Sequence, residues 1–391
     1  MAVAERRSWG VLASLFLLSV GFTAYVIAPA SVFPLVMAEF GIDKPSASAS
    51  ISAVFLTWAV LQIPGGYVLD RHDNRRLVVL GSVIFLLGAT GGLFVGGYRA
   101  FLVSRLLSGA TVVFGFVGSV NVLRRVLPDH RRALGISVYV ASPPVGLALA
   151  QFSAPRIAAP YGWRAAVLAY LLVALAGLVG FMAALRRPIT PEERASASAF
   201  LAALRNPSVL LVSLSSLCTY AVWTYLNTWM PTYGNEVLGI DLAAAGATAA
   251  LVPLAGVLAR PAGGWLADLL DGGHRPVIVA SFLASAVLLV LLNAATSPPA
   301  FAALLALTGA AVNLAVGLYL VYVGALADEA TQATQATSLS VLATFSQVGN
   351  LVAPVVGGWV IAEVSWTAGF GFGVALAVLG LGAVLLAPVS A

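Results

Sequence analysis

The sequence predicts an all-α integral membrane protein with twelve transmembrane helices in two pseudo-symmetric halves of six. The first observation behind this prediction is composition. Of the 391 residues 60% are hydrophobic and only 9% are charged, whereas a soluble domain carries about 25% charged residues. The second is pattern, because the apolar residues form long runs without the period-two alternation of strands. A soluble fold of this size could not cover its surface with so few charges.

A transmembrane helix needs about 20 apolar residues in succession. The first half of the chain has six such runs, at 9–36, 48–69, 77–97, 100–123, 133–158 and 165–185. The second half has six more, at 208–230, 243–267, 277–295, 300–326, 336–361 and 366–388. The first run is too long for a signal peptide and lacks a small-residue cleavage site before the next polar loop. We therefore expect it to remain as the first span.

The arginines set the expected orientation, because cytoplasmic loops of membrane proteins are enriched in Lys and Arg. With the N-terminus inside, the inner segments carry Arg6, Arg7, Arg71, Arg75, Arg76, Arg124, Arg125, Arg131, Arg132, Arg186, Arg187, Arg194, Arg205 and Arg275. The outer loops carry only Lys44, Arg99 and Arg164, with Arg156 near the outer end of the fifth span. Both termini are predicted to be cytoplasmic, in a plasma membrane.

The longest hydrophilic stretch between spans lies at the midpoint of the chain, at 186–207. We predict a six-helix half at 1–185, a cytoplasmic linker at 186–207 and a second half at 208–391. The halves share a Gly-Gly-aromatic-x-x-Asp motif that ends at Asp70 in one and at Asp268 in the other. Equivalent halves with a binding site between them, near the middle of the membrane, are typical of transporters.

The motifs resemble those of the major facilitator superfamily. Gly66-x-x-x-Asp70-Arg71-x-x-x-Arg75-Arg76 is similar to its signature loop, and Gly264-x-x-x-Asp268 is similar to the copy in the second half. Arg105-x-x-x-Gly109 resembles a further motif of that family in the fourth span. The resemblance extends over the whole chain. It implies the fold of that superfamily and secondary transport by alternating access.

Two departures from the family pattern stand in these loops. Asp73 and Asn74 replace the usual glycine and arginine of the first copy, and Leu269 replaces the arginine that follows the aspartate of the second. The second copy is therefore expected to form a weaker latch.

A gate is the function that we expect of the paired motifs. A carboxylate at the C-terminal end of a helix is disfavoured by the macrodipole, so Asp70 must gain from partners such as nearby arginines or the start of another helix. Glycines would let helices approach closely. The expected gating residues are Gly66, Asp70, Arg71, Arg75, Gly264 and Asp268. The alternative for the arginines is that they only anchor the topology.

An enzyme is not expected. The histidines, His72, His130 and His274, all lie in inner loops, and Cys218 is the single cysteine. We find no metal-ligand spacing, no phosphate-binding glycine loop and no nucleophile elbow. No metal, cofactor or nucleotide-driven motor is implied, so transport would depend on gradients. The formal charge of +5 is explained by topology and does not indicate nucleic acid.

Two arginines inside spans are the main clue to the substrate, because an ionisable group in a membrane is costly unless it faces water or a partner. Arg105 lies in the fourth span and Arg260 in the eighth, while no Asp or Glu lies in the middle of any span. This pattern favours a positive cavity that takes an anion. The alternative for each arginine is a structural tie to backbone carbonyls.

The stretch 258–268 is similar to the eighth span of anion transporters of the superfamily, including the nitrate/nitrite type. Gln62 stands where the nitrate branch carries an arginine, and the glycine-rich signatures of that branch are missing from the fifth and eleventh spans. A nitrate porter is therefore not expected, and a small anion of another kind is.

Polar side chains mark the expected cavity faces. Tyr220, Trp223, Thr224 and Asn227 form one stripe of the seventh span. The predicted substrate-binding set is Tyr25, Gln62, Arg105, Tyr139, Tyr220, Trp223, Asn227, Arg260, Asn313, Tyr319 and Gln347. The alternative for any one of them is hydrogen bonding between helices.

The predicted function is transport of a small organic or inorganic anion. The predicted partners are this small molecule and the lipid bilayer, and we expect a working monomer. Uniport, anion exchange and coupling to an ion such as a proton that travels with the substrate all stay open. Two other classes stay open. A drug or metabolite efflux antiporter would keep its substrate affinity without the two arginines, and a non-transporting receptor on the same scaffold would show no flux.

Overall fold

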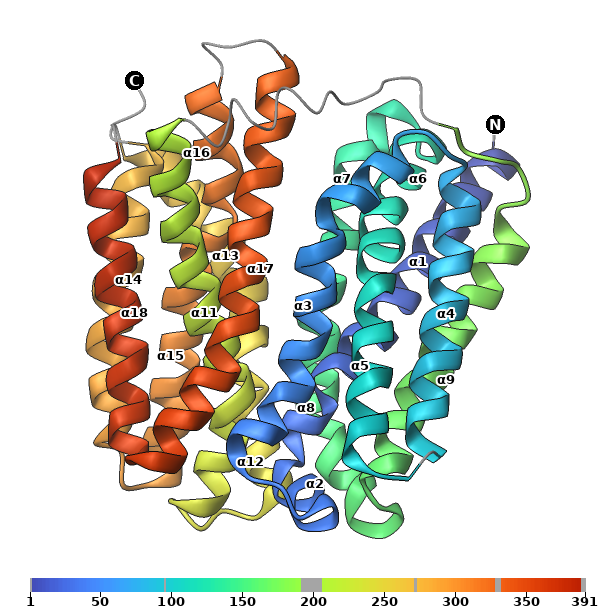
Figure 1. Ribbon diagram of the computed structural model, residues 1–391. Helices are drawn as coiled ribbons and strands as arrows, with labels where there is room; N and C mark the ends of the chain where they lie inside the picture. Colours follow the sequence, from blue (N-terminus) through green and yellow to red (C-terminus); the bar gives the residue numbers. More distant parts are fainter. Residues whose placement is uncertain (1, 95, 191–205, 271–272, 328–331, 388–391) are drawn as a thin grey trace. The chain divides into compact units, whose positions relative to one another are not determined.

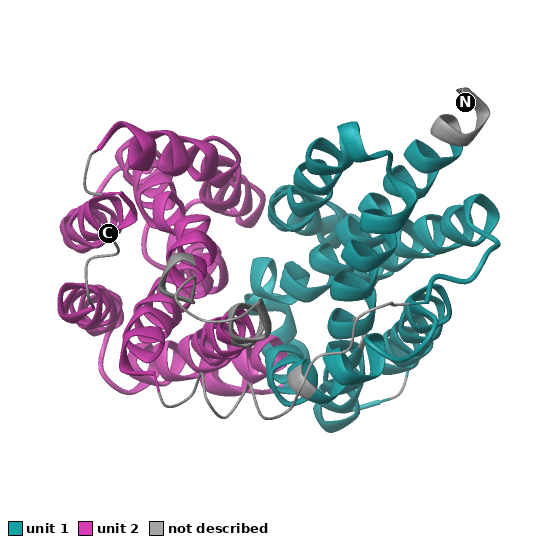
Figure 2. Ribbon diagram, turned by 90° about the horizontal axis from the view of Figure 1, so that it is seen from above, with its two compact units in different colours: residues 1–40, 53–194 teal, residues 41–52, 195–391 magenta. Residues whose placement is uncertain are grey.

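The computed structural model describes residues 2–94, 96–190, 206–270, 273–327 and 332–387, and the elements within these ranges are helical. The chain divides into two compact units, coloured separately in Figure 2. Unit 1 comprises residues 1–40 and 53–194, and unit 2 comprises residues 41–52 and 195–391. The predicted all-helical membrane class is confirmed, because 11 helical stretches of the described part are long and apolar enough to cross a membrane.

In each unit the helices run side by side (Figure 1). The helices of unit 1 are α1 (Ala2–Ser31), α2 (Phe33–Phe40), most of α3 (Lys44–Leu69), α4 (Asn74–Phe94), α5 (Tyr98–Val112), a π-helical turn (Val113–Val117), α6 (Gly118–Val126), α7 (Asp129–Val140), α8 (Ser142–Tyr161) and α9 (Trp163–Ala184). The 26 residues of α3 occupy the place of the predicted second span.

Unit 2 begins with the first turns of α3. Its other helices are α11 (Pro207–Glu236), α12 (Leu242–Ala249), α13 (Leu251–Leu269), α14 (His274–Asn293), α15 (Pro298–Val316), α16 (Leu318–Ala327), α17 (Gln332–Glu363) and α18 (Trp366–Leu386). The start of α3 is held here by an ion pair between Lys44 and Glu236 with an N–O distance of 3.0 Å. The Ser52 hydroxyl also donates to the Leu351 carbonyl at 2.6 Å.

Several predicted spans are broken into two helices. The fifth span breaks at Ala141, between α7 and α8, two residues before Pro143, because a proline cannot continue a helix. The eighth breaks at Ala250 and the tenth at Gly317, and neither break was expected. The fourth contains the π-helical turn Val113–Val117, a feature often found at functional sites.

Small residues let the central helix of each unit pack closely. In unit 1, α1 packs against α9, and a Cβ added at Gly21 would overlap the backbone of Ala174. In unit 2, α11 packs against α17 and α18, and a Cβ at Gly349 would overlap the Leu217 carbonyl. Close packing of this kind drives helix association in membranes, where lipid tails are as apolar as leucine.

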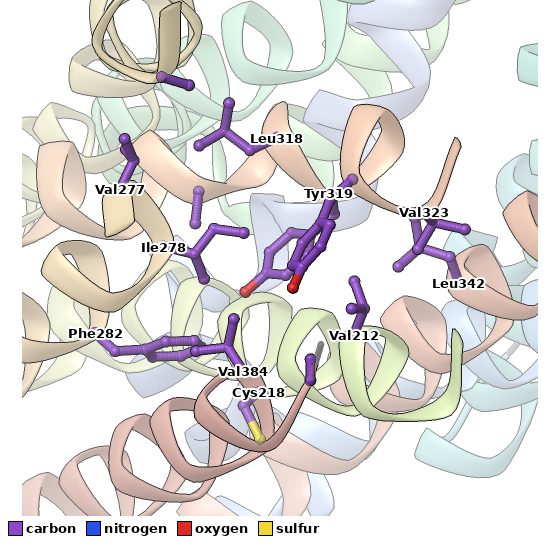
Figure 3. Packing of buried hydrophobic residues seen from close by; sticks show 14 of the residues in the cluster. Val212, Cys218, Val277, Ile278, Phe282, Leu318, Tyr319, Val323, Leu342 and Val384 are labelled. Carbon is purple, nitrogen blue, oxygen red and sulfur yellow. The ribbon is translucent and has the colours of Figure 1, made fainter. Parts of the chain in front are cut away.

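The core of unit 2 combines an apolar cluster with buried polar side chains, and some of these, such as the hydroxyls of Ser213, Thr228 and Ser285, have no hydrogen-bond partner among the described residues. Figure 3 shows side chains of α11, α14, α16, α17 and α18 that converge on one cluster. Tyr319 and Cys218 lie within it and are almost fully buried. The Tyr319 hydroxyl meets those of Ser215 at 3.0 Å and Thr219 at 2.8 Å, so its polar atom is paired inside the core.

The glycine motifs require a correction. We expected Gly66 and Gly264 to allow close helix approach, but a Cβ at either position would meet open space. The preceding glycines have that role. A Cβ at Gly65 would overlap the Val113 side chain, and one at Gly263 would overlap the Leu314 carbonyl. The helical repeat places adjacent residues about 100° apart, so only one of each pair can face the neighbouring helix.

This register gives a matched test in one motif. We predict that Gly263→Ala lowers the unfolding free energy by about 1–3 kcal/mol, because the new methyl group must displace backbone. Gly264→Ala should change it by less than about 0.5 kcal/mol. Unfolding of the purified protein in detergent, followed by circular dichroism, measures both. Equal effects of the two substitutions would contradict the assigned packing.

Candidate functional site

The arginine of the eighth span is held in place by an asparagine of the tenth. Arg260 lies on α13, and its Nε donates to Oδ1 of Asn313 on α15 at 3.0 Å. Asn313 is fully buried and its Nδ2 donates to the Gly309 carbonyl at 2.8 Å, which fixes the amide orientation. Gly256 leaves room for this amide, since a Cβ there would lie 2.6 Å from Oδ1. The guanidinium is therefore preorganised.

The charge of Arg260 has no acidic partner. Among the described residues, no carboxylate lies within ion-pair distance of it. The Tyr220 hydroxyl is near enough to interact with the guanidinium electrostatically. The Arg260 residue is partly exposed, while its guanidinium is largely desolvated by the surrounding protein. A cation within a span that is neither neutralised nor fully buried is a candidate anion site.

Two aromatic residues of α11 extend this site. The rings of Tyr220 and Trp223 meet edge to face with centroids 6.4 Å apart. The indole nitrogen of Trp223 is buried and has no hydrogen-bond partner among the described residues. Buried donors are nearly always satisfied in proteins, so this N–H group is a candidate ligand contact. Arg260, Tyr220 and Trp223 thus form one candidate site in unit 2.

Other polar residues of α11 and α17 form hydrogen bonds within and between these two helices. The Thr224 hydroxyl donates to Oδ1 of Asn350, and Asn350 donates to Oε1 of Gln347 at 3.1 Å. Asn227 donates to the carbonyl of Trp223 in its own helix at 2.8 Å. For these residues, as for Tyr319, the observed contacts are hydrogen bonds within and between helices, which was the alternative to substrate binding.

Arg105 makes a helix tie. Its guanidinium is fully buried and donates to the carbonyl of Tyr25 at 2.9 Å and to that of Val26. It also lies over the Tyr25 ring, 4.5 Å from the centroid. Because α1 has Pro29 near its end, the Tyr25 carbonyl lacks its usual N–H partner four residues on. The arginine therefore satisfies backbone that the proline leaves open.

Unit 1 contains a cavity that the sequence did not reveal as a set. It is lined by Leu18, Ser19, Phe22, Thr23, Trp58, Ser82, Val112, Gly115, Phe116, Tyr139 and Pro143. Of the predicted residues only Tyr139 is in this lining, where it stacks on Phe116 with centroids 5.2 Å apart. Tyr25 and Gln62 are not in it, and Gln62 accepts from the Trp58 indole at 2.7 Å. Ser19 and Thr23 lie one turn apart in the first predicted span, and this polar pair was the sequence pattern that could have indicated the cavity.

Three hydroxyls of this cavity are hydrogen-bonded within the protein, and the Ser19 hydroxyl accepts from Ser142 of α8 at 2.6 Å. Thr23 donates to the Ser19 carbonyl at 2.5 Å, and Ser82 donates to the Val78 carbonyl at 2.7 Å. The cavity therefore presents mainly aromatic and aliphatic surface to a ligand.

The signature loop after α3 is clamped by the two residues that depart from the family pattern. Oδ1 of Asp73 accepts from the Ile189 backbone N–H at 2.8 Å, and the Asn74 N–H donates to the Ile189 carbonyl at 2.8 Å. Buried Asn74 also donates to the Leu69 carbonyl and accepts from Asn121. Arg75 donates to the Leu185 carbonyl at 2.6 Å. These bonds join the loop to the segment after α9.

The remaining predicted gating residues differ in setting. Arg71 lies over the Tyr67 ring, 3.4 Å from its centroid, and donates to the Tyr67 carbonyl. Asp70 is partly buried, and its backbone N–H donates to the Gly66 carbonyl at 2.9 Å. Asp268 is exposed. The gating role of all these residues stays a prediction.

Comparison with known proteins gives a family match over almost the whole chain. The model of the Major Facilitator Superfamily matches residues 12–272 and 238–390. Curated relatives include a probable nitrate/nitrite transporter of Mycobacterium tuberculosis, 28% identical over 67% of this chain and 66% of the relative. A nitrite extrusion protein of Bacillus subtilis is 25% identical over 63% and 62%. A probable sulfoacetate transporter of Cupriavidus necator is 24% identical over 60% and 59%.

These alignments cover less than two thirds of the length of each relative.

Solved structures are similar in fold. A POT family transporter in complex with a thioalcohol-conjugated peptide has a TM-score of 0.78 at 14% identity, covering 96% of this chain and 95% of that one. A bacterial homologue of the human lysosomal transporter Spinster has a TM-score of 0.74 at 16% identity, covering 97% and 96%.

Proposed function

The chain belongs to the Major Facilitator Superfamily, and on this basis we propose that it is a secondary transporter that moves a small anion by alternating access. The observation that carries the substrate class is Arg260, a preorganised guanidinium within a span and without an acidic partner among the described residues. Its positive charge is stabilised when an anion binds, which gives the site a preference for anions over cations. The names of the nitrate, nitrite and sulfoacetate relatives support the same class.

An organic anion fits the described residues better than an inorganic one. Unit 2 supplies a single cation with two aromatic neighbours, Tyr220 and Trp223. A carboxylate or sulfonate on an aromatic body would use both the charge of Arg260 and the rings of Tyr220 and Trp223, whereas nitrate would use only the charge.

We further propose a monomer in the plasma membrane with both termini in the cytoplasm, as the distribution of arginines favours. Because no Asp or Glu lies in the middle of a predicted span, coupling would not use a carboxylate there, and uniport, anion exchange and a proton that travels with the anion all stay open. Asp70 and its loop would act as an inner gate, on a support formed by Asp73, Asn74 and Arg75.

The two arginines within spans give a matched pair. We predict that Arg260→Gln lowers anion transport by roughly 30-fold or more, because the charge that attracts the ligand is lost. Its thermal stability should stay the same or rise, since a desolvated cation is removed. Arg105→Gln should instead lower the stability, because buried carbonyls of α1 lose their donor. Proteoliposome uptake of nitrate, carboxylates and sulfonates, with melting curves of each variant, measures both effects.

Wild-type flux of all these anions in Arg260→Gln would refute the proposed site. Flux of a cationic drug that survives both substitutions would support an efflux antiporter instead. Absence of flux for every compound, with binding retained, would support a receptor.

The two motif copies should contribute unequally to gating. We predict that Asp70→Ala slows transport at least about fivefold, because Asp70 is partly buried at the end of α3. Asp268→Ala should have a smaller effect, because Asp268 is exposed and no arginine follows it. Initial uptake rates at saturating substrate provide the comparison. Equal and negligible effects would mean that the motif is only a charged loop.

A further inference from the structure

A group of exposed basic side chains lies at the end of unit 1 where the chain begins. Arg124 and Arg125 are in the last turn of α6, and Arg131 is in the first turn of α7. Arg186 and Arg187 follow the end of α9, and Arg7 is near the start of α1. All six are exposed. We call these six residues the basic rim.

Contacts of α1 with α6 and α9 show that the rim is continuous across α1. The Ser8 hydroxyl donates to the carbonyl of Val126 at 2.9 Å, which places Arg7 beside the end of α6. One turn further along α1, a Cβ at Gly10 would contact the Cβ of Ala184 at 3.9 Å, which places the end of α9 on another side of α1. The start of α1 and the end of α6 lie at the same end of unit 1 in Figure 1.

The acidic residues described near the rim are already engaged. Asp129 pairs with Arg132 in the same turn of α7. Asp73 pairs with Arg76 at 3.4 Å and accepts from the Ile189 N–H. In the described part of the chain, no carboxylate forms an ion pair with Arg7, Arg124, Arg131, Arg186 or Arg187. Among the described residues, the rim therefore carries a local excess of positive charge.

An apolar face of α9 leads to this charge. Leu172, Leu175, Val179 and Met182 are 58%, 43%, 52% and 37% exposed. Their spacing of three and four residues places them on one side of the helix. Met182 is the last of them, and Arg186 follows four residues later, just beyond the end of α9. The surface is thus amphipathic along its length, with an exposed aliphatic stripe that ends at two arginines.

From this arrangement we propose that the basic rim, together with the exposed face of α9, binds an anionic phospholipid of the inner leaflet. Guanidinium groups form strong charge-assisted hydrogen bonds to phosphate oxygens, and basic groups at helix ends on the cytoplasmic side bind anionic head groups. The acyl chains lie along Leu172, Leu175, Val179 and Met182. Topology alone requires positive charge somewhere in the inner loops, but it does not require charges that converge at the end of an aliphatic stripe.

The test measures lipid binding and does not depend on transport. Purified protein in a zwitterionic detergent is titrated with phosphatidylglycerol, and binding is followed by native mass spectrometry and by the rise in melting temperature. For Arg186→Gln/Arg187→Gln we expect roughly a tenfold loss of affinity and of most of the rise. Arg186→Lys/Arg187→Lys should retain most of both. Arg99→Gln removes an exposed arginine of the opposite, outer loops and should behave as wild type.

Three results would overturn the proposal. In the first, the glutamine double variant binds phosphatidylglycerol as tightly as wild type. In the second, Arg99→Gln weakens binding to the same extent, which would mean that only total charge matters. In the third, inorganic phosphate or phosphatidylcholine raises the melting temperature as much as phosphatidylglycerol, which would mean that the rim does not recognise an anionic lipid. Melting curves without lipid verify that each variant is folded.

Discussion

The hydrogen bond between Arg260 and Asn313 is the interaction from which the functional account follows. The charge of a guanidinium within a membrane span is unfavourable unless a partner stabilises it. A neutral amide orients the guanidinium through a hydrogen bond but does not neutralise its charge. Asn313 is itself fixed by the Gly309 carbonyl and by the space above Gly256. The result is an oriented cation with residual positive charge beside Tyr220. An anion binding there would meet a preformed donor, which lowers the cost of ordering the site on binding.

The second arginine shows why residue type alone could not define the site. Arg105 and Arg260 both lie within predicted spans, yet Arg105 donates to the Tyr25 carbonyl, which Pro29 leaves without its helical partner. Which neighbour a side chain meets depends on the rotation and packing of separate helices. The sequence could therefore identify both arginines as energetically unfavourable charges within spans. It could not tell that Arg105 ties two helices together while Arg260 forms the candidate site.

The fold class followed from the sequence because twelve long apolar runs admit few other structures in a membrane. The helix breaks, the close-packing glycines and the loop clamp depend on tertiary contacts, so the sequence alone did not predict them. The break at Gly317 has no local proline signal, and Pro253, three residues after the break at Ala250, was overlooked. The close-packing glycines proved to be Gly65 and Gly263, one residue before those expected. Asp73 and Asn74, read as departures from a family pattern, form the clamp to Ile189, a contact more than a hundred residues away in sequence.

The most direct measurement of the central claim is a thermal-shift comparison of charge classes on the purified wild-type protein, since a ligand stabilises the state to which it binds. Aromatic and aliphatic carboxylates and sulfonates are compared with their uncharged amides and with cations of the same shape. The account predicts that the anions raise the melting temperature in a saturable way, while the amides and cations do not. Stabilisation by the cations, or equal stabilisation by anions and amides, would contradict an anion site at Arg260.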